Sequence, residues 1–134
     1  MRFMMLYRPG RDDGLPPNPD VFAKLDQLTR EATAVGTFIS TDGLHPSAKG
    51  ARVSISNGNF AVIDGPFTEA KEVIAGYAIL QLSSKEEAIE HAKRFLAVMG
   101  EGQTEVRQML DPSDFAEAAA AAHAASRPNT STGR

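Results

Sequence analysis

The sequence predicts a single α+β domain with the ferredoxin-like βαββαβ order, into which one β-hairpin is inserted. Two observations lead to this prediction. Two stretches carry apolar residues at helical spacing, and six shorter stretches have the composition or alternation of strands. Their order is strand, helix, strand, hairpin, strand, helix, strand. Without the hairpin, two strand–helix–strand halves remain, which form an antiparallel sheet with both helices on one face.

Length and composition fit one globular domain. The chain has 134 residues, 42% of them hydrophobic, which is enough for one core. Its net charge is −3 and it has no Lys/Arg-rich run, so no nucleic-acid partner is expected. It has no cysteine for disulfides or thiolate metal sites. No apolar stretch is long enough for a signal peptide or a membrane span, so we expect a cytoplasmic protein without membrane contact.

The first half of the domain contains a strand, a helix and a second strand. Arg2–Tyr7 (RFMMLY) is the first strand, and a Pro- and Gly-rich loop follows it. Asn18 and Pro19 predict the start of the helix, because Asn caps helices and Pro fits the first turn. The helix carries an apolar stripe that is predicted to pack in the core: Val21, Phe22, Leu25, Leu28, Ala32 and Val35. Gly36 predicts its end, and residues 37–44 predict the second strand.

The inserted hairpin is predicted between residues 51 and 63. Residues 51–56 (ARVSIS) alternate, which places Val53 and Ile55 on one face. Asn57-Gly58 is the strongest short signal for a two-residue hairpin turn, and residues 59–63 return. The next strand, at 73–82 (VIAGYAILQL), is predicted to be the longest.

The second half closes the domain. Ser84-Lys85-Glu86-Glu87 is a capping box and starts a helix, which ends at Gly100. Residues 104–110 are predicted as the last strand. The domain therefore covers residues 1–111. Residues 112–134 are predicted as an alanine-rich helix, at about 113–125, followed by a flexible tail.

The motif Asp64-Gly65-Pro66-Phe67 follows the hairpin directly and allows two interpretations. Structurally, Gly and Pro build a rigid corner, Asp accepts backbone N–H groups, and Phe67 anchors the corner in the core. Functionally, a carboxylate at a strand end beside an apolar wall acts as a base with a raised pKa. A rigid corner serves both purposes, so the motif alone leaves both interpretations open.

Three stretches together resemble one family. DGPFTEAKE (64–72) with the following AGY (75–77), GLHPSAKGARV (43–53) and EVR (105–107) resemble the DGPF-domain branch of the YCII-related proteins. The resemblance extends from Met1 to about Phe115. It implies a dimeric α/β-barrel assembly with a deep pocket near the sheet. It also implies a family that includes enzymes with a His–Asp pair, among them a dehydrochlorinase of a chlorinated aromatic. The first-helix histidine of YCII proteins is missing, because residues 19–35 contain none.

The candidate site residues gather at the loop ends near these motifs. Asp64 and His45 are the candidate catalytic base and acid, and the chain path predicts both at the same edge of the sheet. The candidate ligand-binding residues are Ser47, Lys49, Arg52, Tyr77 and Arg107, the arginines being suited to an anionic group. His91 and His123 are expected to be solvated. No metal-ligand spacing occurs, and no cofactor is predicted.

Two functions follow, and the sequence does not decide between them. The first is a cofactor-independent enzyme that performs elimination or isomerisation on a small anionic or aromatic compound. The second is a non-catalytic dimeric module that binds a small ligand or a protein. In both cases the sheet face without helices requires cover, so the sequence predicts a homodimer that packs sheet to sheet.

Overall fold

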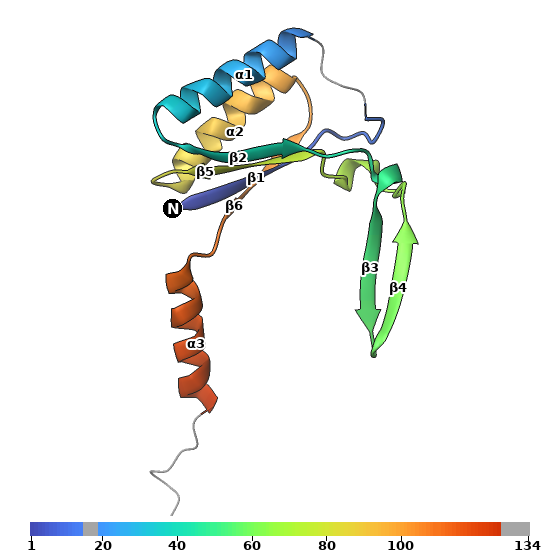
Figure 1. The fold of residues 1–134 in the computed structure, drawn as a ribbon, viewed down its shortest axis with the longest axis vertical. Helices are drawn as coiled ribbons and strands as arrows, with labels where there is room; N and C mark the ends of the chain where they lie inside the picture. Colours follow the sequence, from blue (N-terminus) through green and yellow to red (C-terminus); the bar gives the residue numbers. More distant parts are fainter. Residues whose placement is uncertain (15–18, 127–134) are drawn as a thin grey trace, which may run out of the picture.

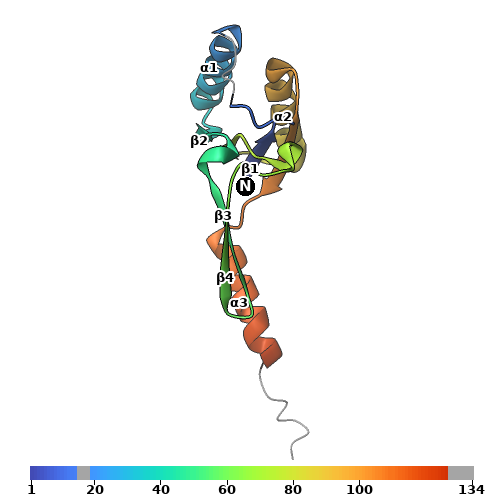
Figure 2. The same cartoon turned by 90° about the vertical axis from the view of Figure 1, so that its right-hand side faces the viewer.

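A computed structural model describes residues 1–14 and 19–126 (Figure 1). Its main sheet is antiparallel, in the order β2-β5-β1-β6. The strands are β1 (Arg2–Arg8), β2 (Phe38–Gly43), β5 (Gly76–Gln81) and β6 (Gln103–Gln108). Helices α1 (Pro19–Ala34) and α2 (Lys85–Met99) lie on the same face of this sheet (Figures 1 and 2). The predicted α+β class and ferredoxin-like order are confirmed.

The core lies between α2 and the sheet. Phe3, Met5 and Tyr7 of the central strand β1 are buried, and the residues between them are half-buried. This alternation is that of a strand with one covered face. Phe3, Met5, Leu80, Leu82 and Ala88 form the core cluster. Met4, Leu6 and Ile79 point the other way, to the sheet face without helices, which we call the open face.

The ends of α2 follow the predicted signals. Ser84 Oγ accepts a hydrogen bond from Glu87 N at 3.2 Å. The Glu87 carboxylate accepts from the N–H and the hydroxyl of Ser83, both at 2.8 Å, instead of from Ser84. Gly100 ends the helix with φ +78°, a conformation that glycine adopts without steric cost. The predicted capping box therefore forms with a shift of one residue on its carboxylate side.

Helix α1 departs from the predicted core packing. None of its residues is buried, and Phe22 is 54% exposed. Val35, immediately after the helix, is 74% exposed. The reason is a cavity between α1 and the rest of the domain, so that most of the apolar stripe lines this cavity instead of filling a core. Gly36 follows the helix with φ +77°, as predicted. The predicted Asn18 cap lies outside the described residues.

The predicted hairpin forms a separate two-stranded sheet. Strands β3 (Ala51–Ser56) and β4 (Asn59–Asp64) project away from the domain (Figures 1 and 2). Asn57 and Gly58 have φ +51° and +80°, as a type I′ turn requires. Residues 51–64, which we call the arm, are exposed throughout.

The strand predicted at 73–82 begins later, at Gly76. Residues Ala70–Glu72 form a short 3₁₀ helix, η2, and Val73 is buried next to it. The first three residues of the predicted strand, 73–75, therefore belong to the irregular segment between η2 and β5, a boundary that hydrophobicity alone does not reveal. Helix α3 (Pro112–Ser126) carries no buried residue and projects from the domain. The predicted tail beyond it lies outside the described residues.

Candidate functional site

Ser47 is the centre of a buried polar network at the base of the arm. It begins the 3₁₀ helix η1 (Ser47–Lys49) and is 7% exposed. Its N–H donates to Asp12 Oδ1 at 2.8 Å, and its hydroxyl donates to Asp12 Oδ2. The same hydroxyl oxygen accepts from Phe67 N at 2.9 Å. One serine thus joins the loop after β1, the turn before β3 and the corner after β4.

Gly65 brings the corner against the Ser47 turn. Its N–H donates to the carbonyl oxygen of Gly50 at 3.0 Å. A Cβ atom at this position would lie 1.7 Å from the carbonyl oxygen of Ser47. The peptide bond between Gly65 and Pro66 is cis. The DGPF motif therefore requires glycine because two backbone segments meet there without room for a side chain.

Phe67 supports Arg52 at the arm's base. The Arg52 guanidinium carbon lies 3.8 Å from the centre of the Phe67 ring, a cation–π contact. The prediction that Phe67 anchors the corner in the core is wrong, because its side chain is only half-buried and contacts Arg52 instead. Beside it is a hollow of about 240 Å³, lined by His45, Ser47, Arg52, Phe67, Glu72, Val73 and Ile74.

The structure brings together three of the seven predicted site residues in this hollow, namely His45, Ser47 and Arg52. Asp64 is exposed at the end of β4, opposite Ala51 in the arm. Within residues 1–14 and 19–126, no hydrogen bond or ion pair joins Asp64 to His45. The turns that carry them do meet, through Gly65 and Ser47, but the acid–base pair stays a proposal.

The remaining predicted residues lie apart. Lys49 is exposed on η1. Arg107 pairs in register with Met4, which places it on the open face, where it forms an ion pair with Glu105 at 3.0 Å. Tyr77 pairs in register with Leu6, which places its ring on the open face, and its hydroxyl donates to Asp42 Oδ2 at 3.1 Å.

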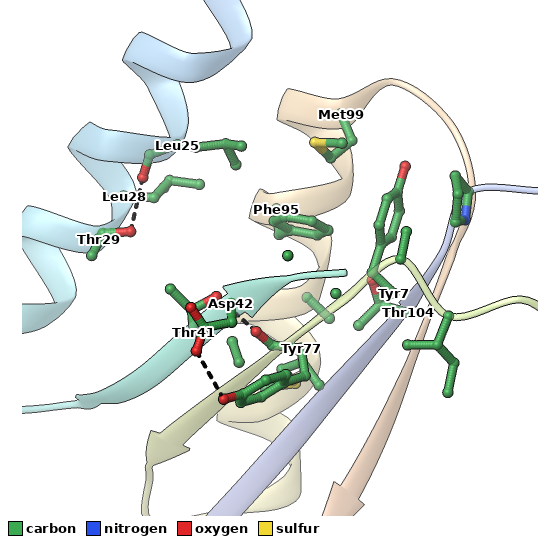
Figure 3. Close-up of a pocket in the computed structure, with 18 of the residues that line it drawn as sticks. Tyr7, Leu25, Leu28, Thr29, Thr41, Asp42, Tyr77, Phe95, Met99 and Thr104 are labelled. Atoms are coloured by element: carbon green, nitrogen blue, oxygen red, sulfur yellow. Dashed lines mark hydrogen bonds between the residues drawn. The ribbon is translucent and has the colours of Figure 1, made fainter. Parts of the chain in front are cut away.

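The cavity beside α1 has a volume of about 1190 Å³. Leu25 and Leu28 of α1 face Phe95 and Met99 of α2 across it, and the sheet forms its floor (Figure 3). Further apolar residues line it, including Met5, Val21, Phe22, Ala78 and Leu80. Small-molecule sites are mostly apolar and concave like this space, with volumes of about 300 to 1,000 Å³, so the cavity is somewhat larger than the volume that one such ligand needs.

Tyr7 and Thr104 supply polar atoms to the cavity floor (Figure 3). The Tyr7 hydroxyl donates to the carbonyl oxygen of Glu101 at 2.9 Å, and its ring meets Phe95 edge-on at 5.0 Å. Burial, and next the charge of Glu101, raise the pKa of Tyr7, so its hydroxyl stays a donor at neutral pH. Thr104 Oγ1 is buried without a hydrogen-bond partner in the described part of the chain.

His91 is a cavity residue that the sequence analysis missed. It was expected to be solvated, but it is half-buried on α2 and lines the cavity. Burial, and next the positive charge of Arg94, lower its pKa, against the opposing effect of Glu87. Its imidazole is therefore neutral at physiological pH. The available signal was its helical spacing, four residues before Phe95 on the same face.

We expect the His91 environment to make the fold less stable in mild acid. Because the folded pKa lies below the ordinary value of 6.5, the unfolded chain binds the proton more tightly. The stability that depends on a neutral His91 is fully present above pH 6.5 and decreases as the pH falls through the folded pKa. Melting temperatures from about pH 7.5 to about pH 5 should therefore fall less steeply in His91→Gln than in the wild type. His123→Gln, on the exposed helix α3, controls for loss of an imidazole. Parallel curves for His91→Gln and the wild type would contradict this account.

The two short 3₁₀ helices, the corner and the cavity all lie within the segment matched by one family. A family model of the YCII-related domain matches residues 1–111. The chain belongs to the YCII-related family. The predicted YCII-related family is therefore confirmed, its DGPF-domain branch stays a prediction, and the match ends immediately before α3.

Two further comparisons complete the picture of this YCII-related chain. It is 30% identical over 73 residues to an uncharacterized protein of Rhizobium meliloti (strain 1021), a match that spans 54% of this chain and 59% of the relative. It is also similar to the 5-chloro-2-hydroxyhydroquinone dehydrochlorinase of Burkholderia phenoliruptrix AC1100 in complex with 2,5-dihydroxybenzoquinone. That likeness has 14% identity and a TM-score of 0.38, over 84% of this chain and 97% of the other. In the described residues, no helix is long and apolar enough to cross a membrane.

Proposed function

We propose that this YCII-related protein binds a small, planar, largely apolar compound in the cavity between α1, α2 and the sheet. The observation that carries the proposal is the apolar stripe of α1, which lines this space without being buried. Covering a Leu or Phe side chain completely stabilises by about 1.5 to 3 kcal/mol. A ligand that fills the space between Leu25, Leu28 and Phe95 would therefore be held mainly by the hydrophobic effect.

The charges around the cavity favour a neutral compound over an anion. Its lining contains six carboxylates and two guanidinium groups: Asp12, Asp13, Glu31, Asp42, Glu87 and Glu101 against Arg11 and Arg94. Arg11 is already in ion pairs with Asp13 and Glu101. Polar groups that can orient a ligand include the Thr104 hydroxyl and the neutral His91, whose Nε2 lies 3.3 Å from Arg94 Nη2. A phenol or a quinone fits this chemistry better than an aromatic carboxylate.

A thermal-shift screen tests the proposal. A neutral phenol or quinone at a hundredfold excess over its Kd should stabilise the fold by about 2.7 kcal/mol, which shifts Tm by several degrees. Leu25→Gln should abolish the shift, because it places an amide in the apolar wall. Lys24→Gln, its exposed neighbour on α1, should keep it. Equal shifts in both variants would locate the binding elsewhere, and a response confined to aromatic acids would contradict the neutral-ligand assignment.

Acid–base chemistry on the bound compound is the second candidate, and the position of His45 favours it. His45 lines both the cavity and the hollow that contains Arg52 and Glu72. In this version His45 carries a proton, Arg52 holds an anionic group, and Asp64 acts as the base. A screening hit incubated with catalytic amounts of protein would change its NMR spectrum, and His45→Gln would stop the change without abolishing the thermal shift. An unchanged hit leaves the protein as a binding module.

We also propose that the chain forms a homodimer through the open face of its sheet. The support is that Met4, Leu6 and Ile79 lie on this face at half burial, opposite the face that the helices cover. On this face Glu105 pairs with Arg8 at 2.9 Å and with Arg107 at 3.0 Å, so one carboxylate serves two guanidinium groups.

A further inference from the structure

The arm has one apolar face that the described part of the domain does not cover. In the arm's register, Val53 is paired with Val62 and Ile55 with Phe60. Because side chains of directly opposed residues share a face, these four lie together. They are 66%, 64%, 62% and 75% exposed. The opposite face carries Ser56 opposite Asn59, Ser54 opposite Ala61 and, at the base, Arg52 opposite Ile63.

This exposure is unusual for a chain that acts alone. Thirteen large hydrophobic side chains of the described residues are exposed, whereas eight hydrophobic residues form the buried core. Residues 53–63 of the arm contain no charged side chain to oppose pairing with another chain. A free two-stranded hairpin is at best marginally stable in water. The Ser47 network and the Gly65 contact nevertheless fix the arm's base, so its direction is set by the fold.

The direction in which the arm projects indicates which molecule covers its apolar face. The arm and α3 both extend from the side of the sheet that the helices leave uncovered, one at each end (Figures 1 and 2). Whatever lies on the open face therefore lies between them. Standard interfaces take about 20 to 30 residues from each side. The apolar face of the arm contributes four exposed side chains, so the open face has to contribute the rest of such an interface.

We propose that the arm clasps a second copy of this chain, with the face formed by Val53, Ile55, Phe60 and Val62 packed on that copy. The inference rests on the sheet-face dimer proposed above and adds the element that holds it. Two-fold symmetry makes the contact reciprocal, so each copy gives one arm and receives one. The arm carries charge only at its base, at Arg52 and Asp64.

Light scattering and sedimentation of the full chain test the clasp with variants on the two faces of the arm. The wild type should be a dimer at micromolar concentration. Phe60→Glu should raise the dimer dissociation constant at least about thirtyfold, the effect of losing one central interface side chain. Val62→Glu should repeat this result from the neighbouring pair. Ala61→Glu, between them on the polar face, should leave the dimer intact. Hydrogen exchange should also slow in residues 51–64 as the protein concentration rises.

The outcomes separate the two proposals. A monomeric wild type overturns both the sheet-face dimer and the clasp. A dimer that survives both Phe60→Glu and Val62→Glu overturns the clasp and leaves the sheet-face dimer standing. Equal weakening by Ala61→Glu overturns the assignment of the apolar face. Concentration-independent protection of the arm means that it folds onto its own chain, which also overturns the clasp. Ligand binding in the cavity is measured independently of the dimer, by the thermal shift.

Discussion

Replacing Gly65 with alanine is expected to cost more than about 4 kcal/mol of the free energy of unfolding, a size reserved for severe local conflicts. The added Cβ would lie 1.7 Å from the carbonyl oxygen of Ser47 and 2.5 Å from its carbonyl carbon. Both are backbone atoms, so they cannot move aside as a flexible side chain does. The corner must open, and the Ser47–Phe67 hydrogen bond opens with it. Urea denaturation measures the loss directly.

Gly50→Ala is the matched control. Its Cβ would lie 3.5 Å from the same Ser47 oxygen, an ordinary contact, and its φ of −121° suits any residue. Its stability should equal that of the wild type or exceed it by up to about 1 kcal/mol, because alanine restricts the unfolded chain. If Gly65→Ala also stays within about 1 kcal/mol of the wild type, the close approach at the corner is not a feature of the protein in solution.

The fold was predictable because local signals and global order agree in this chain. Asn57-Gly58 fixed the hairpin turn, and the Ser84 capping box fixed the start of α2. The packing of α1 was not predictable, since the same amphipathic stripe lines a cavity or fills a core. Periodicity identifies which face is apolar, but the distance between that face and its neighbours is a tertiary property. Phe22 and Val35 belong to the apolar stripe and are nevertheless exposed, as residues that line a cavity instead of filling a core.

The site was predictable only in part. The motifs located the corner, and three of the seven named residues share one hollow. Sequence distance gave no sign that Asp12 binds Ser47 across 35 positions, because long-range side-chain contacts leave no periodic pattern. His91 was missed for a related reason, as its charged neighbours Glu90 and Arg94 suggest a solvated face. Charged neighbours in the sequence therefore do not show whether a residue on a helix is exposed or half-buried.

Ser47→Ala is expected to lower the free energy of unfolding by about 3 kcal/mol. The substitution removes the hydroxyl that donates to Asp12 and accepts from Phe67 N. A hydrogen bond to a charged group contributes about 1.5 to 3 kcal/mol, and an unsatisfied buried donor costs a further 1 to 3 kcal/mol. Ser54→Ala, on the exposed arm, is the control and should change stability by less than about 0.5 kcal/mol.

The same variants distinguish a structural corner from a ligand site. If Ser47 acts only as the hub of the corner, Ser47→Ala loses stability while a bound ligand shifts Tm as much as in the wild type. Asp64→Asn then changes neither property appreciably, since Asp64 is exposed and the amide keeps its size and turn-forming ability. If Asp64 acts with His45, Asp64→Asn changes the NMR signals of the His45 ring and weakens ligand binding. Loss of ligand binding in Asp64→Asn at unchanged stability would favour the functional interpretation of the motif, in which the Asp64 carboxylate takes part in the site.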